Sequence, residues 1–238
     1  MSLRLEAPYS DGILRSAHLY LAKGDEIVPG RPILTGDIFQ DVQLEPGSSK
    51  SPRMVMMLHH PCSMRRDGIK LRSKLLVAKV DKVNVWGEGS WQMNYAYMGL
   101  PGLGIEAPEG KHWAVNFNEL YTVSPASLTN RSTCLSNAGI NILLQRWVHF
   151  SSRVVVPTFD FQTATEPFFE ETELMETWCD EFEAESEEDV QAASKACLEW
   201  LRNAPEGQAT PQERLKYPQE RSGVRRDMNR HIRSLLKS

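Results

Sequence analysis

The fold of this 238-residue chain is decided by the stretch Arg53-Met54-Val55-Met56-Met57-Leu58-His59-His60-Pro61-Cys62-Ser63-Met64-Arg65-Arg66. Its first half is an apolar run of the length of a buried β-strand. Its second half gathers two imidazoles, a thiol, a hydroxyl and two guanidiniums directly after that strand. Loops that follow strands are where a rigid scaffold presents reactive groups. The stretch therefore predicts both a sheet and a candidate site at the end of one strand.

Further strands are expected on both sides of this stretch. The turn-forming loop Pro46–Pro52 precedes it, and the turn signal Asp67-Gly68 follows it. The predicted strands lie at residues 33–45, 53–59, 74–83, 95–98, 112–117 and 119–123. Several short strands with frequent turns are typical of a small antiparallel barrel or sandwich. Residues 17–21 fit either a strand or a single helical turn, and residues 153–157 fit a closing strand.

The second half of the chain changes to a helical period. Apolar residues at helical spacing predict a helix over 135–148, with Ser136 or Asn137 as its N-cap. Further helices are expected from residue 166, after Ser186, and over 219–237. We therefore predict an α+β chain. A small antiparallel β-barrel domain with an N-terminal extension occupies residues 1–125, and a helical region occupies residues 126–238.

Charge is strongly segregated along the chain although the net charge is only −4. Residues 158–189 contain thirteen acidic and no basic residues, whereas residues 190–238 contain ten basic and five acidic ones. The acidic belt, 158–189, can be a solvated helix face, a surface for a basic partner, or a cover over a basic groove. The basic helix 219–237 can bind nucleic acid or dock on the acidic belt.

The composition excludes several classes of protein. No apolar run reaches the roughly 18 residues of a membrane helix, and the first residues lack the apolar core of a secretion signal. The four cysteines, Cys62, Cys134, Cys179 and Cys197, are widely spaced and form no CxxC pair, which argues against a zinc site or a disulfide scaffold. We expect a cytoplasmic protein with no membrane association, no metal and no cofactor.

The residues after the 53–58 strand are the candidate catalytic groups. A thiol beside an imidazole is typical of a nucleophilic site, and His and Cys are also transition-metal ligands. The alternative is that Cys62 packs as a small apolar residue and the imidazoles hydrogen-bond within their loop. Adjacent strand residues point to opposite faces, so His59 and His60 can share one site only where the strand has ended. The candidate catalytic residues are Arg53, His59, His60, Cys62 and Arg65.

Basic residues and aromatic residues follow in close succession. Guanidinium and ammonium groups bind phosphates, and aromatic faces stack on unpaired bases, as single-stranded RNA recognition requires. The alternative is a solvated strand face with aromatic side chains in the core. The candidate residues for binding nucleic acid or a partner are Arg66, Arg72, Lys74, Lys79, Trp86 and Trp91.

Residues 36 to about 150 resemble the MazF/PemK family of growth-inhibitor toxins. Gly36-Asp37-Ile38-Phe39 is similar to the strand that opens that family's domain, and Arg53–Leu58 is similar to its second strand. Leu75–Val80 resembles the third strand, and Val115–Val123 with the following helix resembles the end of the domain. The resemblance implies an SH3-like barrel that cleaves RNA as part of a toxin–antitoxin pair.

In this family an Arg on the second strand or its loop and a Thr at the end of the third strand carry RNA cleavage. Arg53 matches the Arg, whereas the third strand reads Ala78-Lys79-Val80-Asp81 and supplies no Thr. We therefore expect a protein that interacts with single-stranded RNA, as a metal-independent endoribonuclease if it is an enzyme. In that reaction a ribose 2′-hydroxyl attacks its own phosphate, with His59 or His60 as base and Arg53 and Arg65 stabilising the phosphorane.

Two other functions are open from the sequence. SH3-like barrels also occur as non-catalytic rings in the head–tail connectors of tailed phages, and fold does not fix function. The chain can thus be a homo-oligomeric structural module of a large assembly or an accessory defence protein, with a protein as its partner. A cysteine-based enzyme using Cys62 is the third possibility.

Overall fold

The computed structural model describes residues 5–7, 16–28, 30–44, 51–66, 70–87 and 90–237. Most of the predicted loop 46–52, the turn at 67–68 and the side chain of Cys62 lie outside the described residues. The chain forms two compact units, one made of residues 1–27, 33–66 and 71–164, the other of residues 28–32, 67–70 and 165–238. The first unit thus extends beyond the boundary predicted at 125.

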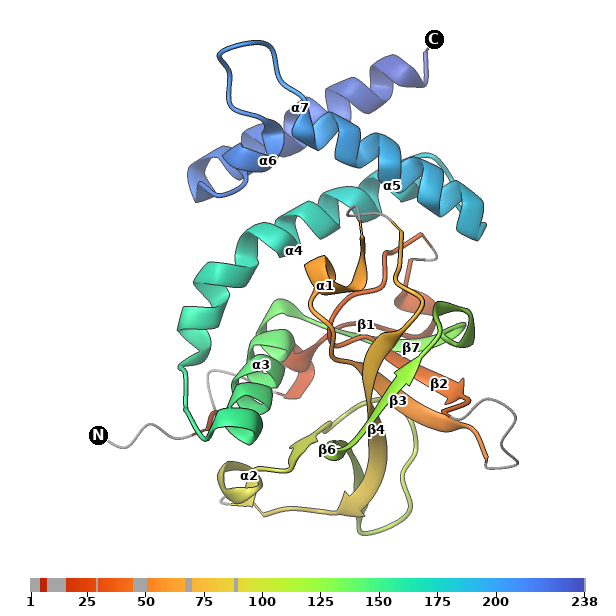
Figure 1. Ribbon diagram of the computed structural model, residues 1–238, viewed down its shortest axis with the longest axis vertical. Helices are drawn as coiled ribbons and strands as arrows, with labels where there is room; N and C mark the ends of the chain where they lie inside the picture. The colour runs from red at the N-terminus through yellow and green to blue at the C-terminus, as the bar shows by residue number, and fades with distance from the viewer. Residues whose placement is uncertain are drawn as a thin grey trace. The chain divides into compact units, whose positions relative to one another are not determined.

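The first unit is built on one antiparallel sheet (Figure 1). Its strands are β1 (Tyr20–Lys23), β2 (Ile38–Val42), β3 (Arg53–Met57), β4 (Leu75–Asn84), β5 (Tyr97–Gly99), β6 (Lys111–Val123) and β7 (Asn130–Leu135). They pair in the order β1-β7-β2-β3-β4-β6-β5. With the helices described below, this confirms the predicted α+β class.

The two end strands, β1 and β5, are not joined by a ladder within the described part of the chain, so the sheet is not closed. The loop after β5 nevertheless reaches β1. The Tyr20 hydroxyl donates to the carbonyl of Pro101 at 3.0 Å, and the Lys23 ammonium donates to the carbonyl of Gly102. Side chains of one edge strand thus bond to the backbone beyond the other, in place of strand pairing.

The apolar run that opened the sequence forms the centre of the sheet. β3 lies between β2 and β4, and only its first residue, Arg53, is exposed. Both faces of a central strand must be covered, which explains why Met54 to Met57 do not alternate with polar residues. One face packs into the hydrophobic cluster Phe39, Val42, Val55, Met57, Met64, Leu75, Val77, Val123 and Leu128.

The longest ladder joins β4 to β6, and it contains a register shift. Ala78 pairs with Leu120, but the next residue, Lys79, pairs with Asn116. Residues 117–119 of β6 therefore have no partner in this ladder. Because three is an odd number, β6 side chains that would point to one face of the sheet after a regular pairing point to the other face beyond the shift. The sequence predicted two strands with a break at residue 118, and the structure has one strand with this shift at the same place.

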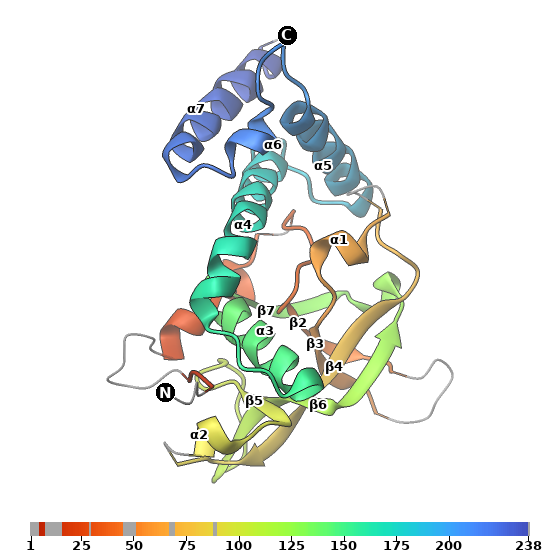
Figure 2. The same cartoon turned by 60° about the vertical axis from the view of Figure 1, so that its left-hand side comes forward.

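A 16-residue helix, α3 (Asn137–Ser152), packs on the sheet face opposite to the hydrophobic cluster that contains Val55 and Met57 (Figure 2). Its N-cap is Ser136, whose hydroxyl accepts a hydrogen bond from the amide of Gly139 at 3.1 Å, as one of the two predicted caps. The ring of Phe117 on β6 lies 5.6 Å from that of Trp147. Strand β7, which the sequence did not predict, leads into this helix, whereas the predicted strand at 153–157 has no regular structure.

One buried arginine on α3 ties four backbone segments together. The Arg146 guanidinium is 1% exposed and donates to the carbonyls of Glu6 and Trp91 at 3.0 Å. It also reaches the carbonyls of Asn94 and Tyr97 at 3.3 and 3.4 Å. These bonds fix the N-terminal segment, the helix α2 (Ser90–Met93) and strand β5 against α3.

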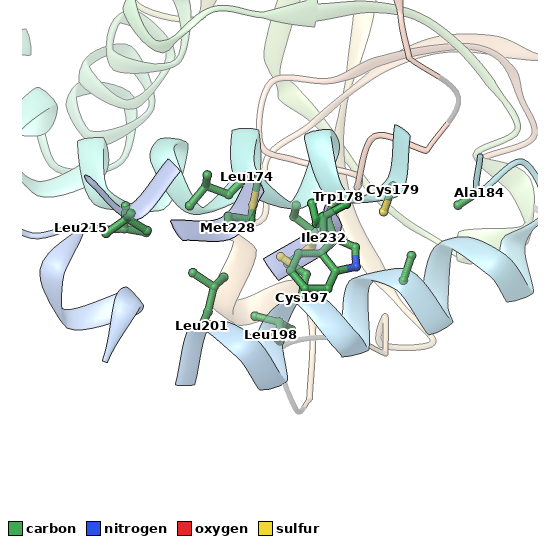
Figure 3. Packing of buried hydrophobic residues seen from close by; sticks show 13 residues of the cluster. Leu174, Trp178, Cys179, Ala184, Cys197, Leu198, Leu201, Leu215, Met228 and Ile232 are labelled. Atoms are coloured by element: carbon green, nitrogen blue, oxygen red, sulfur yellow. The ribbon is translucent and has the colours of Figure 1, made fainter. Parts of the chain in front are cut away.

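The second unit is helical. Its elements are α4 (Thr158–Glu181), which begins in the first unit, α5 (Glu187–Arg202), α6 (Pro211–Arg214) and α7 (Pro218–Leu235). Side chains from α4, α5 and α7 point toward one another around Trp178 in a common core (Figure 3). Ser186 caps α5 as predicted, because its hydroxyl accepts from the amide of Asp189 at 3.1 Å.

Ion pairs connect α7 to the acidic face of α4. Arg225 contacts Glu170 and Glu173 at 2.5 Å, and Arg221 contacts Glu166 at 3.1 Å. The predicted docking of the basic helix on the acidic belt is therefore found, through Arg221 and Arg225. No helix within the described ranges is long and apolar enough to span a membrane.

The first prediction concerns Arg146. Replacing it with Met keeps a long side chain but leaves buried carbonyls without their donor, so we expect Arg146→Met to lower the free energy of unfolding by about 3 kcal/mol. The exposed Arg202 is the control, since Arg202→Met should change it by less than about 0.5 kcal/mol. Urea denaturation followed by circular dichroism measures both. Equal stability of Arg146→Met and the wild type would contradict this role.

The second prediction uses neighbouring residues on α7. Arg225→Gln removes the contacts to Glu170 and Glu173, and we expect it to destabilise the protein by about 1 kcal/mol. Arg226→Gln removes the same charge from an exposed position one residue further on and should have almost no effect. Because the Arg225 pairs are partly exposed, the difference between the two variants should shrink in 1 M salt. Identical thermal midpoints for both variants would refute the docking network.

Candidate functional site

The structure divides the predicted site residues among three places. The strand-end cluster is the group that follows β3 and precedes β4, namely His59, His60, Cys62, Arg65, Arg66, Arg72 and Lys74. Arg53 and Lys79 belong to a second group on the face of the sheet. Trp86 and Trp91 belong to a third group near the end of the β4–β6 ladder.

His59 has a structural role in the strand-end cluster. Its Nδ1 accepts a hydrogen bond from the amide of Leu76 on β4 at 3.1 Å. Burial and, second, the charge of Arg72 hold the pKa of His59 below its ordinary value. The neutral ring therefore carries its proton on Nε2, and both nitrogens are committed. This arrangement leaves His59 no free lone pair with which to act as a general base.

The other groups near His59 also close the fold. The carbonyl of His60 accepts from the amides of Ser63 and Met64, which starts α1 (Pro61–Met64). Burial lowers the pKa of the His60 imidazole. The Arg65 guanidinium donates to the carbonyl of Ile33 at 2.8 Å. Met64 is fully buried in the hydrophobic cluster of β3 and β4, so the segment 59–66 packs against the end of the sheet.

Three cations of the strand-end cluster remain exposed. Arg66, Arg72 and Lys74 have no ion pair with another described residue. Their charges give this end of the sheet a local positive potential. That potential supports binding of an anionic partner but supplies no catalytic geometry by itself.

Arg53 lies far from the histidines. It begins β3, and His59 follows six residues later, after the strand has ended. An extended chain rises about 3.3 Å per residue, so the two residues are about 20 Å apart. Arg53 and His59 cannot contact one phosphate together. The structure thus separates the base and the cation that the sequence placed in a single site.

A second polar group, which we call the sheet-face site, consists of Arg53, Lys79, Asp81 and Asn116. Lys79 and Asp81 point to the same face of β4, and the Lys79 ammonium lies 2.8 Å from Asp81 Oδ1. The amide of Asn116 on β6 donates to Asp81 Oδ2 at 3.0 Å. Asp81 is thereby bonded through both oxygens and orients a lysine and an asparagine.

The register explains how these residues meet. Val55 on β3 pairs with Lys79 on β4, which in turn pairs with Asn116 on β6. Arg53 lies two residues from Val55 and Asp81 two residues from Lys79, so all of these side chains share one face. Without the shift in β6, Lys79 would face residue 119 instead of Asn116. Asn116 is buried, and its Oδ1 accepts from the amide of Asn118 within the shifted segment.

Aromatic rings continue the same face beyond the sheet-face site. Tyr97 on β5 pairs with Asn116, and its ring lies 6.3 Å from that of Trp86. Trp86 also packs edge-to-face on His112 at 4.6 Å. Gly99 allows Trp91 and Trp86 to pack closely on β5, because a Cβ there would lie 2.5 Å from the Trp91 ring and 3.1 Å from the Trp86 ring. A polar group and a ring cluster are thus neighbours on one surface.

The two predicted tryptophans differ in exposure and in role. Trp91 is 8% exposed, and the guanidinium of Arg146 lies over its ring at 5.4 Å, so it is a core residue. Trp86 is partly exposed at the end of the ladder. Of the pair, Trp86 has a surface that a ligand can reach.

Sequence reasoning did not include Asp81, Asn116 and Tyr97 among the site residues. The available signal was the alternation Lys79-Val80-Asp81, which places two opposite charges on one face of an otherwise apolar strand. No comparable signal exists for Asn116, because its place depends on the register shift between β4 and β6.

The cysteines and potential metal ligands form no site in the described part of the chain. Cys134, Cys179 and Cys197 are buried free thiols. Burial raises the pKa of Cys179 and of Cys197, which keeps both as unreactive thiols. Within the described ranges no three His, Cys, Asp or Glu side chains are arranged to hold a metal ion.

Comparison with known proteins adds no relative. No protein-family model matches the chain, and no curated protein is similar to it at a significant level. Function must therefore be argued from the geometry of the site.

The third prediction concerns pH. The folded state disfavours protonated His59, whereas the unfolded chain takes up a proton near the ordinary pKa of 6.5. Stability from this group is therefore complete above pH 6.5 and is lost as the pH falls below it. We expect His59→Asn and Arg72→Gln each to reduce the loss of stability between pH 7 and pH 5. Urea titrations at several pH values measure this.

Two outcomes of that experiment are decisive. Some pH dependence should persist in both variants, because burial also lowers the pKa of His60 and His112. An unchanged pH dependence in His59→Asn would show that burial and the charge of Arg72 do not hold the pKa of this ring below its ordinary value. Arg72 is exposed, so we expect Arg72→Gln to fold normally. This variant therefore still tests the prediction if His59→Asn does not fold.

Proposed function

We propose that this protein binds single-stranded RNA across the face of β3, β4, β6 and β5. The observation that carries the proposal is the contiguity of the sheet-face site with the ring pair of Tyr97 and Trp86. Single-stranded nucleic acid is bound by cations that follow the phosphates and by rings on which bases stack. This surface offers both within one sheet face.

The cationic part of the surface fits a phosphodiester. Arg53 is exposed, and the Lys79 side chain is 22% exposed, so the guanidinium of Arg53 is at the surface and the ammonium of Lys79 is partly accessible. Asp81 holds the Lys79 ammonium in place, which reduces the entropy lost when a phosphate binds. The carboxylate also repels phosphate, and we therefore expect modest affinity that depends on the neighbouring rings.

The resemblance to the MazF/PemK family supports the same ligand. The fold we propose is an SH3-like barrel with incomplete closure, in which Tyr20 and Lys23 bond to the loop after β5. In the family, a Thr on the third strand takes part in RNA cleavage. Lys79 and Asp81 occupy the corresponding part of β4 here. A toxin that acts on RNA is the biological role that this resemblance suggests.

Cleavage of the bound RNA is the reaction that the site would support. The ribose 2′-oxygen attacks the adjacent phosphorus while Asp81 accepts its proton, and the bond to the 5′-oxygen breaks. Lys79 and Arg53 offset the charge of the phosphorane, and the proton passes to the leaving 5′-oxygen. The products are a 2′,3′-cyclic phosphate and a 5′-hydroxyl. This assignment gives Asp81 the role that the sequence assigned to His59 or His60.

A structural role in an assembly is the second candidate function. It is favoured by large apolar side chains on the surface of the first unit, with Met93 and Phe159 both 72% exposed. Exposed apolar groups of this size are typical of surfaces that a second chain covers. A ring-shaped homo-oligomer in light scattering that does not bind RNA would favour this candidate.

The fourth prediction tests RNA binding. We expect a fluorescein-labelled 12-nucleotide uridine RNA to bind in 50 mM salt, and Lys79→Gln with Arg53→Gln to weaken binding about tenfold, or about 1.4 kcal/mol. The matched control is Arg66→Gln with Arg72→Gln, which removes two exposed charges from the strand-end cluster. Fluorescence anisotropy measures all three proteins.

The controls separate the possible results. A larger loss from the control pair than from the sheet-face pair would place the RNA at the strand end and overturn the proposal. Absence of RNA binding by the wild type would overturn it as well. Cleavage is scored separately on denaturing gels in EDTA. Cyclic phosphate ends that disappear in Asp81→Asn support the reaction, and binding without cleavage restricts the function to RNA recognition.

A further inference from the structure

Helix α7 carries a row of cations that is separate from its ion pairs with α4. Arg226, Arg230 and Arg233 follow one another at intervals of four and three residues, which places them on one face of α7, and Lys237 follows two residues after the helix ends at Leu235. All four are exposed. The three arginines extend over about 10 Å of helix axis, with about 4.5 to 6 Å between neighbours. We call these four residues the α7 cation row.

The other faces of α7 are occupied within the second unit. Val224, Met228 and Ile232 are buried in the core shared with α4 and α5. Arg221 and Arg225 contact the carboxylates of α4. The α7 cation row thus lies on a third face of the helix, which is neither buried in the core nor paired with α4.

Little negative charge offsets the row. The two carboxylates of α7, Glu220 and Asp227, both contact Arg214 of α6 at 2.9 and 3.0 Å. Asp227 also reaches Arg230 at 3.5 Å, but the Arg230 side chain is 81% exposed. Arg226, Arg233 and Lys237 form no ion pair with any described residue. The row keeps nearly all of its charge toward solvent.

We propose that the α7 cation row binds the phosphate backbone of a nucleic acid. Three of its four cations are arginines, whose planar groups form paired hydrogen bonds with phosphate oxygens. The exposed residues that border this face, Ser222, Asn229 and Ser234, are small and polar. The centre of a protein interface is usually depleted of charged residues, whereas cations make up this face. The row lies in the second unit, and this inference does not depend on the sheet-face site.

The expected signature is the salt dependence of binding. Each phosphate contact on a single strand contributes about 0.7 to the slope of log affinity against log salt concentration. The variant with Arg226→Gln, Arg230→Gln and Arg233→Gln should therefore lower that slope by about 2 for the 12-nucleotide RNA. Affinity in 50 mM salt should fall about tenfold. The full chain is titrated by anisotropy between 50 and 300 mM salt.

The matched control removes three exposed positive charges elsewhere in the same unit, at Lys195, Arg202 and Lys216. We expect their replacement by Gln to change the slope by less than about 0.5. Equal effects of the two triple variants would show that RNA binding depends only on the net charge of the protein, and this would overturn the proposal. An unchanged slope in the α7 variant would also overturn it.

Two further arms identify the ligand class and separate this proposal from the sheet-face site. Polyglutamate and vesicles containing phosphatidylserine are titrated in parallel. Dependence on the row for either of these, but not for RNA or a DNA of the same length, would assign it to an acidic protein or a membrane and contradict the proposal. Repeating the RNA titration with Arg53→Gln and Lys79→Gln as background should leave the effect of the α7 variant intact.

Discussion

The pairing of β4 with β6 is the constraint on which the first unit depends. Its two segments have different registers, joined where three residues of β6 are passed over between Leu120 and Asn116. On one side of the shift, Val77 and Val123 belong to the hydrophobic cluster that also contains Met64 from the segment after β3. On the other side of the shift, the same face of β4 carries Lys79 and Asp81, and β6 carries Asn116 beside them. The shift thus places a polar β6 residue, Asn116, beside the polar part of this face of β4.

Arginine has different roles in the two units. In the first, Arg146 is buried against backbone carbonyls and holds β5 and α2 in place, which positions Tyr97 and Trp86 beside the polar residues. In the second, Arg225 is neutralised by carboxylates of α4, whereas Arg226 beside it faces solvent. The face of α7 on which an arginine lies therefore decides its role. An arginine that faces α4 stabilises the fold, and an arginine that faces solvent is accessible to a ligand. The proposed nucleic-acid contacts use exposed arginines, Arg53 in the first unit and those of the α7 cation row in the second, together with Lys79, which is paired with Asp81.

The sequence allowed prediction of those elements whose signal is local. The strands expected at 53–59 and 74–83 and the helix cap expected at Ser136 or Asn137 each depend on neighbouring residues, and the structure has β3, β4 and the Ser136 cap at these places. Strand β7 was missed because Asn130 to Leu135 lacks alternation and gains its place only by pairing with β1 and β2. The site was only partly predicted for the same reason. Arg53 and Lys79 were identified, but the distance of Arg53 from His59 and the partnership of Asp81 with Asn116 follow from strand register, which one sequence does not display.

Photocrosslinking tests the central claim, that the face carrying Lys79, Asp81 and Asn116 is where RNA binds. A uridine-rich RNA carrying 4-thiouridine is irradiated in complex with the full chain, and crosslinked residues are identified by mass spectrometry. The account predicts crosslinks at Trp86 or Tyr97, where bases would stack, and their loss in Lys79→Gln. Crosslinks confined to residues 59–72, with none on β4, β5 or β6, would contradict it.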